Sequence, residues 1–139
     1  MVINNQLDTL FNYGSQSKIV VENMRLSNGH FKNGVINTGR TGRNGRITIK
    51  DSVFDQIESI YGTFMYDSYN LGSKKPVNTN SNVMVFENVQ VQNINTNNKG
   101  GIVYSTNPKG SSLYSFRDCK FTNITTSTGK LLINIKFFF

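Results

Sequence analysis

Apolar and polar positions alternate along this chain in short runs, and the runs recur. FENVQVQNI at 86–94 returns as FRDCKFTNI at 116–124, with an aromatic residue, a charged residue, Asn or Asp, and then apolar residues on both sides of a polar one. A period of two residues predicts β-strands. When the copies are aligned on the Asn or Asp, which we call the anchor, the phrase occurs four times at spacings of 28, 37 and 30 residues. The anchors are Asn23, Asp51, Asn88 and Asp118.

A second, shorter apolar phrase follows each anchor. Its copies are GVI at 34–36, GTFM at 62–65, GGIVY at 100–104 and GKLLI at 129–133. TLFNYG at 9–14 matches this second phrase and indicates an earlier, incomplete copy. The repeat therefore covers nearly the whole chain, and a fixed period of this length indicates a stacked repeat architecture.

The apolar residues on the two sides of each anchor are three positions apart. An odd step places them on opposite faces of a flat strand, so both sets can point inward only if the chain turns a corner at the anchor. Asn and Asp tolerate the left-handed backbone conformation that such a corner needs. A second corner is expected a few residues later, at Asn28, Gln56, Asn93 and Asn123. The predicted inward residues are Ile19, Val21, Met24, Leu26, Ile47, Ile49, Phe54, Ile57, Met84, Phe86, Val89, Val91, Ile94, Tyr114, Phe116, Cys119, Phe121 and Ile124.

Strand, corner, strand, corner, strand and connection make one coil of a solenoid. On these columns the sequence resembles the right-handed parallel β-helix repeats of the pectin-lyase-like superfamily. The resemblance implies an all-β fold of about four coils with three parallel sheets, and it also supplies the handedness. Asn93 and Asn123 would then stack about 4.8 Å apart and bond through their side-chain amides. A looser resemblance links these Asn-rich coils to the surface and cellulosome-associated β-helix proteins of anaerobic fungi.

The length of 139 residues fits one domain, which we place at 1–139. The spacing of 37 indicates a loop insertion at 67–82 that leaves the stacked strands in place. Both ends interrupt a coil, so we expect a fragment of a longer array or a chain that a partner completes. Strand edges at the ends favour end-to-end self-association.

Composition adds three constraints. The formal net charge is +7, which favours solubility and attraction to polyanions. The single cysteine, Cys119, excludes an internal disulfide, and its inward position predicts a buried thiol. The chain begins MVINNQ without a signal-peptide pattern, and no apolar run has the length of a membrane span, so we expect no membrane insertion. We expect the parent protein to lie outside the cell or at its surface.

Catalytic residue types are few. His30 and Glu58 share one column, with Asp55 nearby, and an imidazole beside a carboxylate is the minimum for general acid–base chemistry. A solvated pair at a corner is the interpretation we favour. The polygalacturonase-like relatives use NTD, DD, GHG and RIK motifs, whereas this chain has only NTG, GHF and GRITIK and no adjacent Asp pair. A metal site built from Cys and His ligands needs more than the one Cys and one His of this chain, and we expect no metal and no cofactor.

The sharpest local feature is NTGRTGRNGR at 37–46. Arg40, Arg43 and Arg46 recur every third residue between glycines, so their guanidinium groups can converge on one anion. Lys74 and Lys75 in the insertion would extend this patch. A solvated connecting loop is the other interpretation of this segment, and it is the one that we favour. Another charged column, which alternates in sign and which we interpret as structural, contains Glu22, Lys50, Glu87 and Arg117.

These observations predict a non-catalytic structural or binding module of an extracellular or surface protein. Its loops would contact a polysaccharide, another polyanion or another protein module. The alternative is a polysaccharide lyase or glycoside hydrolase of the β-helix type. Asn123 also begins a glycosylation sequon, but its place in the corner column favours a structural role.

Overall fold

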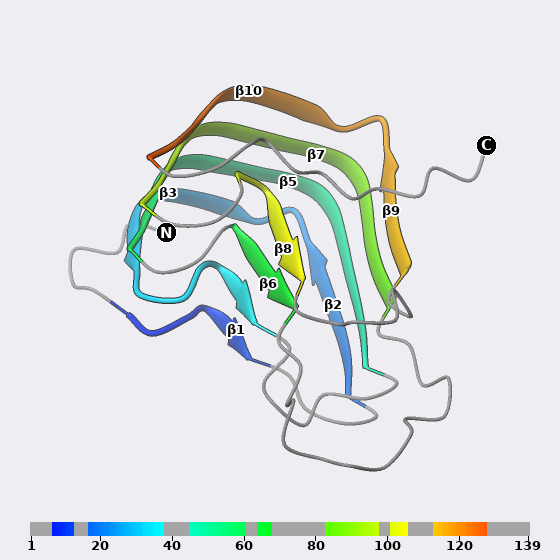
Figure 1. Ribbon diagram of the computed structural model, residues 1–139. Helices are drawn as coiled ribbons and strands as arrows, with labels where there is room; N and C mark the ends of the chain where they lie inside the picture. Colours follow the sequence, from blue (N-terminus) through cyan, green and yellow to red (C-terminus); the bar gives the residue numbers. More distant parts are fainter. Residues whose placement is uncertain are drawn as a thin grey trace, which may run out of the picture.

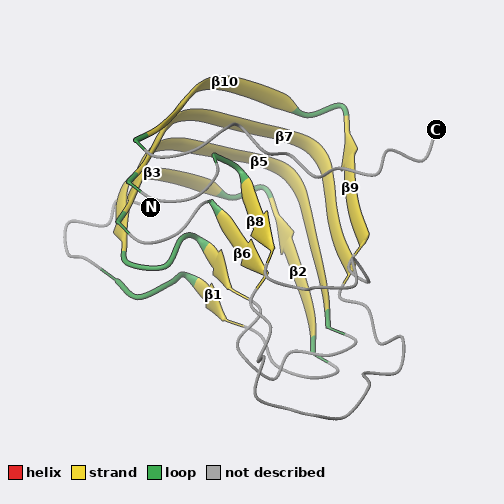
Figure 2. Ribbon diagram, viewed as in Figure 1, coloured by secondary structure: helices red, strands yellow, loops and turns green. Residues whose placement is uncertain are grey.

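The computed structural model is all-β in the residues that it describes, which are 7–12, 17–37, 45–60, 64–67, 83–97, 101–105 and 113–127. No helix occurs among these residues (Figure 2). The strands are β1 Phe11–Asn12, β2 Lys18–Glu22, β3 Arg25–Phe31, β4 Ile36–Asn37, β5 Arg46–Ser59, β6 Met65–Asp67, β7 Val83–Thr96, β8 Val103–Ser105, β9 Leu113–Arg117 and β10 Lys120–Thr126.

The strands form two parallel sheets (Figure 1). The smaller sheet has the order β1-β4-β6-β8, and the larger has the order β10-β7-β5-β2, with β3 beside β5 and β9 beside β7. Each return of the chain therefore adds a strand to the same side of each sheet. The all-β, parallel prediction is confirmed. Hydrogen bonding gives two sheets where three were expected, because β5 and β7 run through their corners without a break.

Strand register reproduces the repeat alignment. Glu22 pairs with Lys50, Lys50 with Glu87, and Glu87 with Arg117, which are the predicted steps. In the smaller sheet Ile36 stands between Phe11 and Met65, and Met65 in turn pairs with Val103, so the second phrase also stacks as predicted. The fourth copy of that phrase, at 129–133, lies outside the described residues.

The predicted corners are the places where the backbone turns. All eight corner residues have a positive φ between 48° and 55°, and in the described part no other non-glycine residue has one. The left-handed conformation is tolerated by Asn and Asp better than by other side chains, because their short polar groups can bond locally. The residues are Asn23, Asn28, Asp51, Gln56, Asn88, Asn93, Asp118 and Asn123.

A buried serine ties two of these corners together. The Ser52 hydroxyl donates to the Lys50 carbonyl at 2.6 Å and accepts from the Met24 amide at 3.1 Å. Ser52 is only 1% exposed, so these bonds satisfy a hydroxyl that would otherwise be costly in the core. The sequence pattern did not place this serine among the inward residues.

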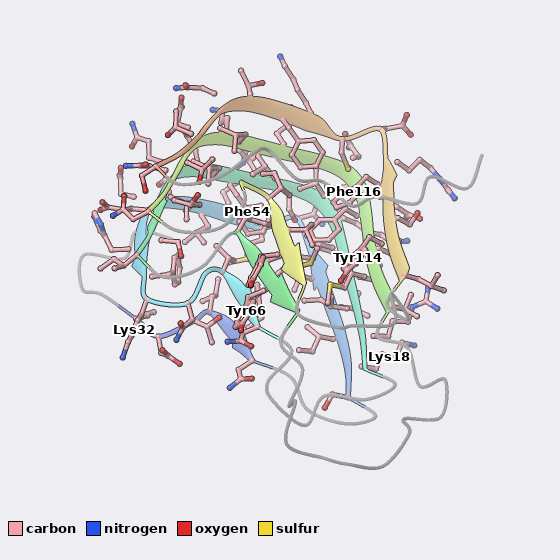
Figure 3. All side chains as sticks on the ribbon, viewed as in Figure 1. Lys18, Lys32, Phe54, Tyr66, Tyr114 and Phe116 are labelled. Carbon is pink, nitrogen blue, oxygen red and sulfur yellow. The ribbon has the colours of Figure 1, made fainter. Side chains whose placement is uncertain are left out.

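The core lies inside the curve of the larger sheet, with the smaller sheet closing it (Figure 3). Phe64 packs edge-to-face on Phe54 with ring centroids 5.0 Å apart, and lies 6.5 Å from Phe86. The predicted inward residues of β5 and β7 are at most 1% exposed: Ile47, Ile49, Phe54, Ile57, Met84, Phe86, Val89, Val91 and Ile94.

Burial is less complete on β9 and β10. Phe116 stacks on Phe86 at 5.0 Å but is only half-buried, as are Phe121 and Ile124. Cys119 is also half-buried, so the prediction of a buried thiol is wrong. Its inward direction is correct, since it packs against the core. The reason for its exposure is position, because this residue belongs to the last strands that the structure describes.

Candidate functional site

The first strand of each repeat begins at one edge of the larger sheet. Lys18, Arg46, Val83 and Leu113 occupy one register position at the starts of β2, β5, β7 and β9. Backbone bonds hold these starts together, with Arg46 N donating to Ser17 O at 2.8 Å and Val83 N to Gly45 O at 2.9 Å. We call these four residues, with the connections that enter their strands, the connection edge. The connections are 13–16, 38–44, 68–82 and 106–112.

Three of the four connections carry cations, and none of the four carries an acidic residue. Their structure lies outside the described residues, so the predicted positions Arg40, Arg43, Lys74 and Lys75 are known here from sequence and from the strand ends that flank them. Lys109 belongs to the same set. The acidic residue nearest in sequence is Asp67, the last residue of β6, where one connection begins.

Lys18 and Arg46 are the two charged residues of the connection edge that lie in the described part of the chain. They pair side by side in the parallel ladder, and both are exposed. Arg46 Nε donates to the Thr48 hydroxyl at 3.5 Å, which directs the guanidinium along the outer face of β5. Adjacent like charges on one face of a sheet are locally unfavourable. Such a pair is therefore easier to explain by an anionic ligand than by stability.

Sequence reasoning found part of this edge. It identified Arg46 as a binding residue, and the structure puts Arg46 at the start of β5. It missed Lys18 and Lys109, although each stands at or just before the start of a first strand. The available signal was the repeat alignment, which sets Lys18 directly against Arg46. In Figure 3, Lys18 lies at the outer end of β2, whereas Lys32 lies at the far side of the molecule.

The alternating charged column forms two of the three ion pairs that its sequence predicts, both at Glu87. Glu87 lies between Lys50 Nζ at 3.0 Å and Arg117 Nη1 at 3.6 Å. The hydrogen bond from Lys50, aided by the two positive charges, lowers the pKa of the Glu87 carboxyl. The column therefore fixes strand register, as expected.

The catalytic candidates are brought together only in part. His30 Nδ1 lies 2.9 Å from Glu58 Oε2, and the two side chains are 53% and 42% exposed. Asp55 belongs to the neighbouring column, where its Oδ1 accepts from Asn93 Nδ2 at 2.7 Å. His30 and Glu58 thus form a solvent-exposed pair between adjacent strands, and Asp55 takes part in a different contact.

Amide side chains bond along the stack at the corners. Asn123 Nδ2 donates to Asn93 Oδ1 at 2.8 Å, as predicted. Asn88 Nδ2 donates to Asp51 Oδ1 at 2.7 Å at the first corner. The sequon residue Asn123 is therefore engaged in the corner ladder, which agrees with its structural interpretation.

Comparisons of the chain with protein-family models, curated proteins and solved structures give no match. Function must therefore be argued from this geometry alone. In the described part of the chain, no three His, Cys, Asp or Glu side chains gather closely enough to hold a metal ion. The same residues contain no helix that is long and apolar enough to cross a membrane.

Proposed function

We propose that this protein is a non-catalytic binding module whose connection edge contacts an extracellular polyanion, such as an acidic polysaccharide. The observation that carries the proposal is the pairing of Lys18 with Arg46 at the edge where the connections enter. Five further cations in those connections have no acidic residue among them. An anionic polymer lying along this edge would meet positive charge at each repeat that it crosses.

The module we propose is a right-handed parallel β-helix of about four coils, related in architecture to the pectin-lyase-like superfamily. The parallel strand order and the recurring left-handed corners support this architecture. A stack of this kind is a rigid support, because each strand is bonded to its neighbours. The rigidity keeps the strand starts of successive repeats, and with them Lys18 and Arg46, at a fixed spacing.

The other charged and amide side chains of the stack bond to one another and are not expected to bind a ligand. Glu87 is neutralised by its neighbours Lys50 and Arg117, and Asp51 is bonded to Asn88. The charged column of Glu22, Lys50, Glu87 and Arg117 sums to zero charge, whereas the connection edge carries cations without an acidic residue. In sequence, Lys18, Arg46 and the five cations of the connections add up to seven positive charges, which equals the formal net charge of +7.

Chromatography on immobilised heparin tests the proposal. We expect the parent protein to bind at low salt, and the variant Arg40→Ser/Arg43→Ser/Arg46→Ser to elute at clearly lower salt with nearly unchanged thermal stability. The matched control Arg25→Ser/Lys32→Ser/Lys120→Ser removes the same charge away from the connection edge and should shift elution much less. Equal shifts for the two variants would show that only net charge matters. A parent that does not bind heparin or pectate at low salt contradicts polyanion binding.

A polysaccharide lyase or glycoside hydrolase is the second candidate, favoured by the 2.9 Å contact between His30 and Glu58. Lyase and reducing-sugar assays on acidic and neutral polysaccharides, run beside the binding measurements, separate the two classes. Activity that is lost in both His30→Gln and Glu58→Gln would establish the enzyme and refute the non-catalytic proposal.

A further inference from the structure

The larger sheet ends at β2 and β3 on one side and at β9 and β10 on the other (Figure 1). Terminal strands of a parallel sheet are templates for adding another strand. The two sides are not equivalent, because the stack has a direction. One side is the first in the chain and the other is the last, so they can pair with each other between two molecules.

Side-chain burial shows that apolar surface is left at both sides. On the last strands, Phe116, Phe121 and Ile124 are half-buried, whereas the residues stacked beneath them on β7 are at most 1% exposed. On the first strands, Val21 and Met24 are half-buried in the same way. These apolar residues have a stacked neighbour in only one direction along the sheet. A strand added at either edge of the sheet would supply the second neighbour and bury them.

We propose that a second copy of this chain docks head to tail, with its β2 and β3 added to β9 and β10 of the first. The register positions at this seam are complementary. Arg117 would meet Glu22 of the second copy, which continues the alternation of sign along the charged column. The corner residue Asp118 would meet Asn23, the same donor and acceptor pair that Asn88 and Asp51 form at 2.7 Å.

The described ends also complement each other in extent. Leu7 pairs with Phe31, and the register carried through Ser59 and Thr96 gives Leu7 the position of Thr126. The first described segment therefore starts at the point of the repeat where β10 ends. Docking in this register would place residues 7–12 of the second copy directly after β10, with Leu7 in the place of Thr126. Its β1 would then lie next to β8, where the phrase at 129–133 was expected to stack.

One outward column opposes the docking. Lys120 would meet Arg25 of the second copy, and like charges on neighbouring strands are unfavourable. Both are long side chains at the surface, where they can turn away from each other. The competing occupant of the position beside β8 is this chain's own segment 128–139, whose phrase at 129–133 was expected to stack there.

Cross-linking tests the seam. In the background Cys119→Ser, one variant carries Glu22→Cys and a second, with a different tag, carries Arg117→Cys. When the two are mixed and oxidised, we expect the mixed disulfide dimer in clear excess over the statistical mixture. A single chain that carries both cysteines serves as a further check. Within that chain positions 22 and 117 are three strand steps, or about 14 Å, apart, which is too far for an internal disulfide. Any cross-link that it forms must therefore join two molecules. A control that pairs Gln90→Cys with Arg117→Cys should give only the statistical mixture.

Sedimentation of the unmodified full chain from micromolar to millimolar concentration supplies the second readout. Growth of successively larger species is expected, since a head-to-tail contact leaves a free side at each end. A chain that stays monomeric throughout this range overturns the proposal. Statistical cross-linking overturns it as well. Slow amide exchange on β8 in such a monomer would assign the position beside β8 to the chain's own segment 128–139.

Discussion

At the scale of single residues, the corners decide the fold, and Gln56 is the one corner residue that is neither Asn nor Asp. Its φ of 54° places a longer side chain in the left-handed region. That conformation costs an ordinary L-residue about 1–2 kcal/mol. Gln56→Asn should therefore raise the free energy of unfolding by up to about 1 kcal/mol, measured by urea denaturation.

The opposite substitution provides the control for this corner. Gln56→Val places a β-branched side chain at the same φ and should lower stability by a similar or larger amount. Equal stabilities of the Asn and Val variants would show that residue 56 is not held in the left-handed conformation.

Cys119 carries a second prediction at this scale. Desolvation by the surrounding side chains raises the pKa of its thiol, against bonds to backbone groups that lower it. Native labelling at neutral pH should be slower than labelling in urea, and its rate should keep rising with pH beyond the ordinary pKa of an exposed thiol. Because its pKa is raised, the Cys119 thiol stays protonated to a higher pH in the folded state than in the unfolded state. Its contribution to the free energy of unfolding is therefore complete at neutral pH and is lost as pH rises through the folded pKa. A labelling rate at neutral pH equal to that in urea would contradict the half-buried position.

The sequence predicted the corners because the odd step across each Asn or Asp leaves no other way to bury both apolar sets. The sequence did not predict which side chain fills the core space beside Gly29, which has no side chain of its own. A methyl group at Gly29 would lie 2.6 Å from the Phe31 ring and 3.0 Å from Ile57. Phe31 fills the space that the isoleucines occupy on the following strands, and such exchange of volume between neighbours is visible only in three dimensions.

At the scale of strands, the charged column makes a prediction for Glu87. Its pKa is lowered first by the hydrogen bond from Lys50. Lys50→Met should raise the pKa of Glu87 toward its ordinary value, which a carboxyl titration followed by NMR would detect. Stability that depends on this carboxylate is present above its unfolded pKa and is lost as pH falls through the lowered folded pKa.

Lys120→Met is the matched control for this column, since it removes the same charge from a strand position outside the column. The pKa of Glu87 should change little in that variant. A pKa unaffected by Lys50→Met would mean that the 3.0 Å contact does not persist in solution.

The connection edge shows where strand-level reasoning from sequence stopped. The arginines of 37–46 form a local motif, whose spacing is compatible with an anion site and also with a solvated connecting loop. That Lys18 stands beside Arg46 depends on register between separate repeats. Local motifs do not contain this information, whereas the repeat alignment does once strand pairing is assumed.

At the scale of the whole molecule, stacking turns a local sequence feature into a long surface. Each repeat contributes one strand start and one connection to the same edge. Cations that are far apart in sequence, such as Lys18 and Arg46, are thereby brought side by side. A polymer that runs along the stack can engage several repeats, and this is the physical basis of the proposed binding.

The salt dependence of binding to a heparin-like oligosaccharide of defined length tests this claim most directly. Binding through several cations releases counterions, so log K should fall linearly with log salt for the parent protein. Lys18→Ser/Arg46→Ser should bind more weakly and reduce the slope by about 1 to 2, whereas Lys32→Ser/Lys120→Ser should leave the slope nearly unchanged. Indistinguishable slopes for the two double variants would contradict the connection edge as the binding surface.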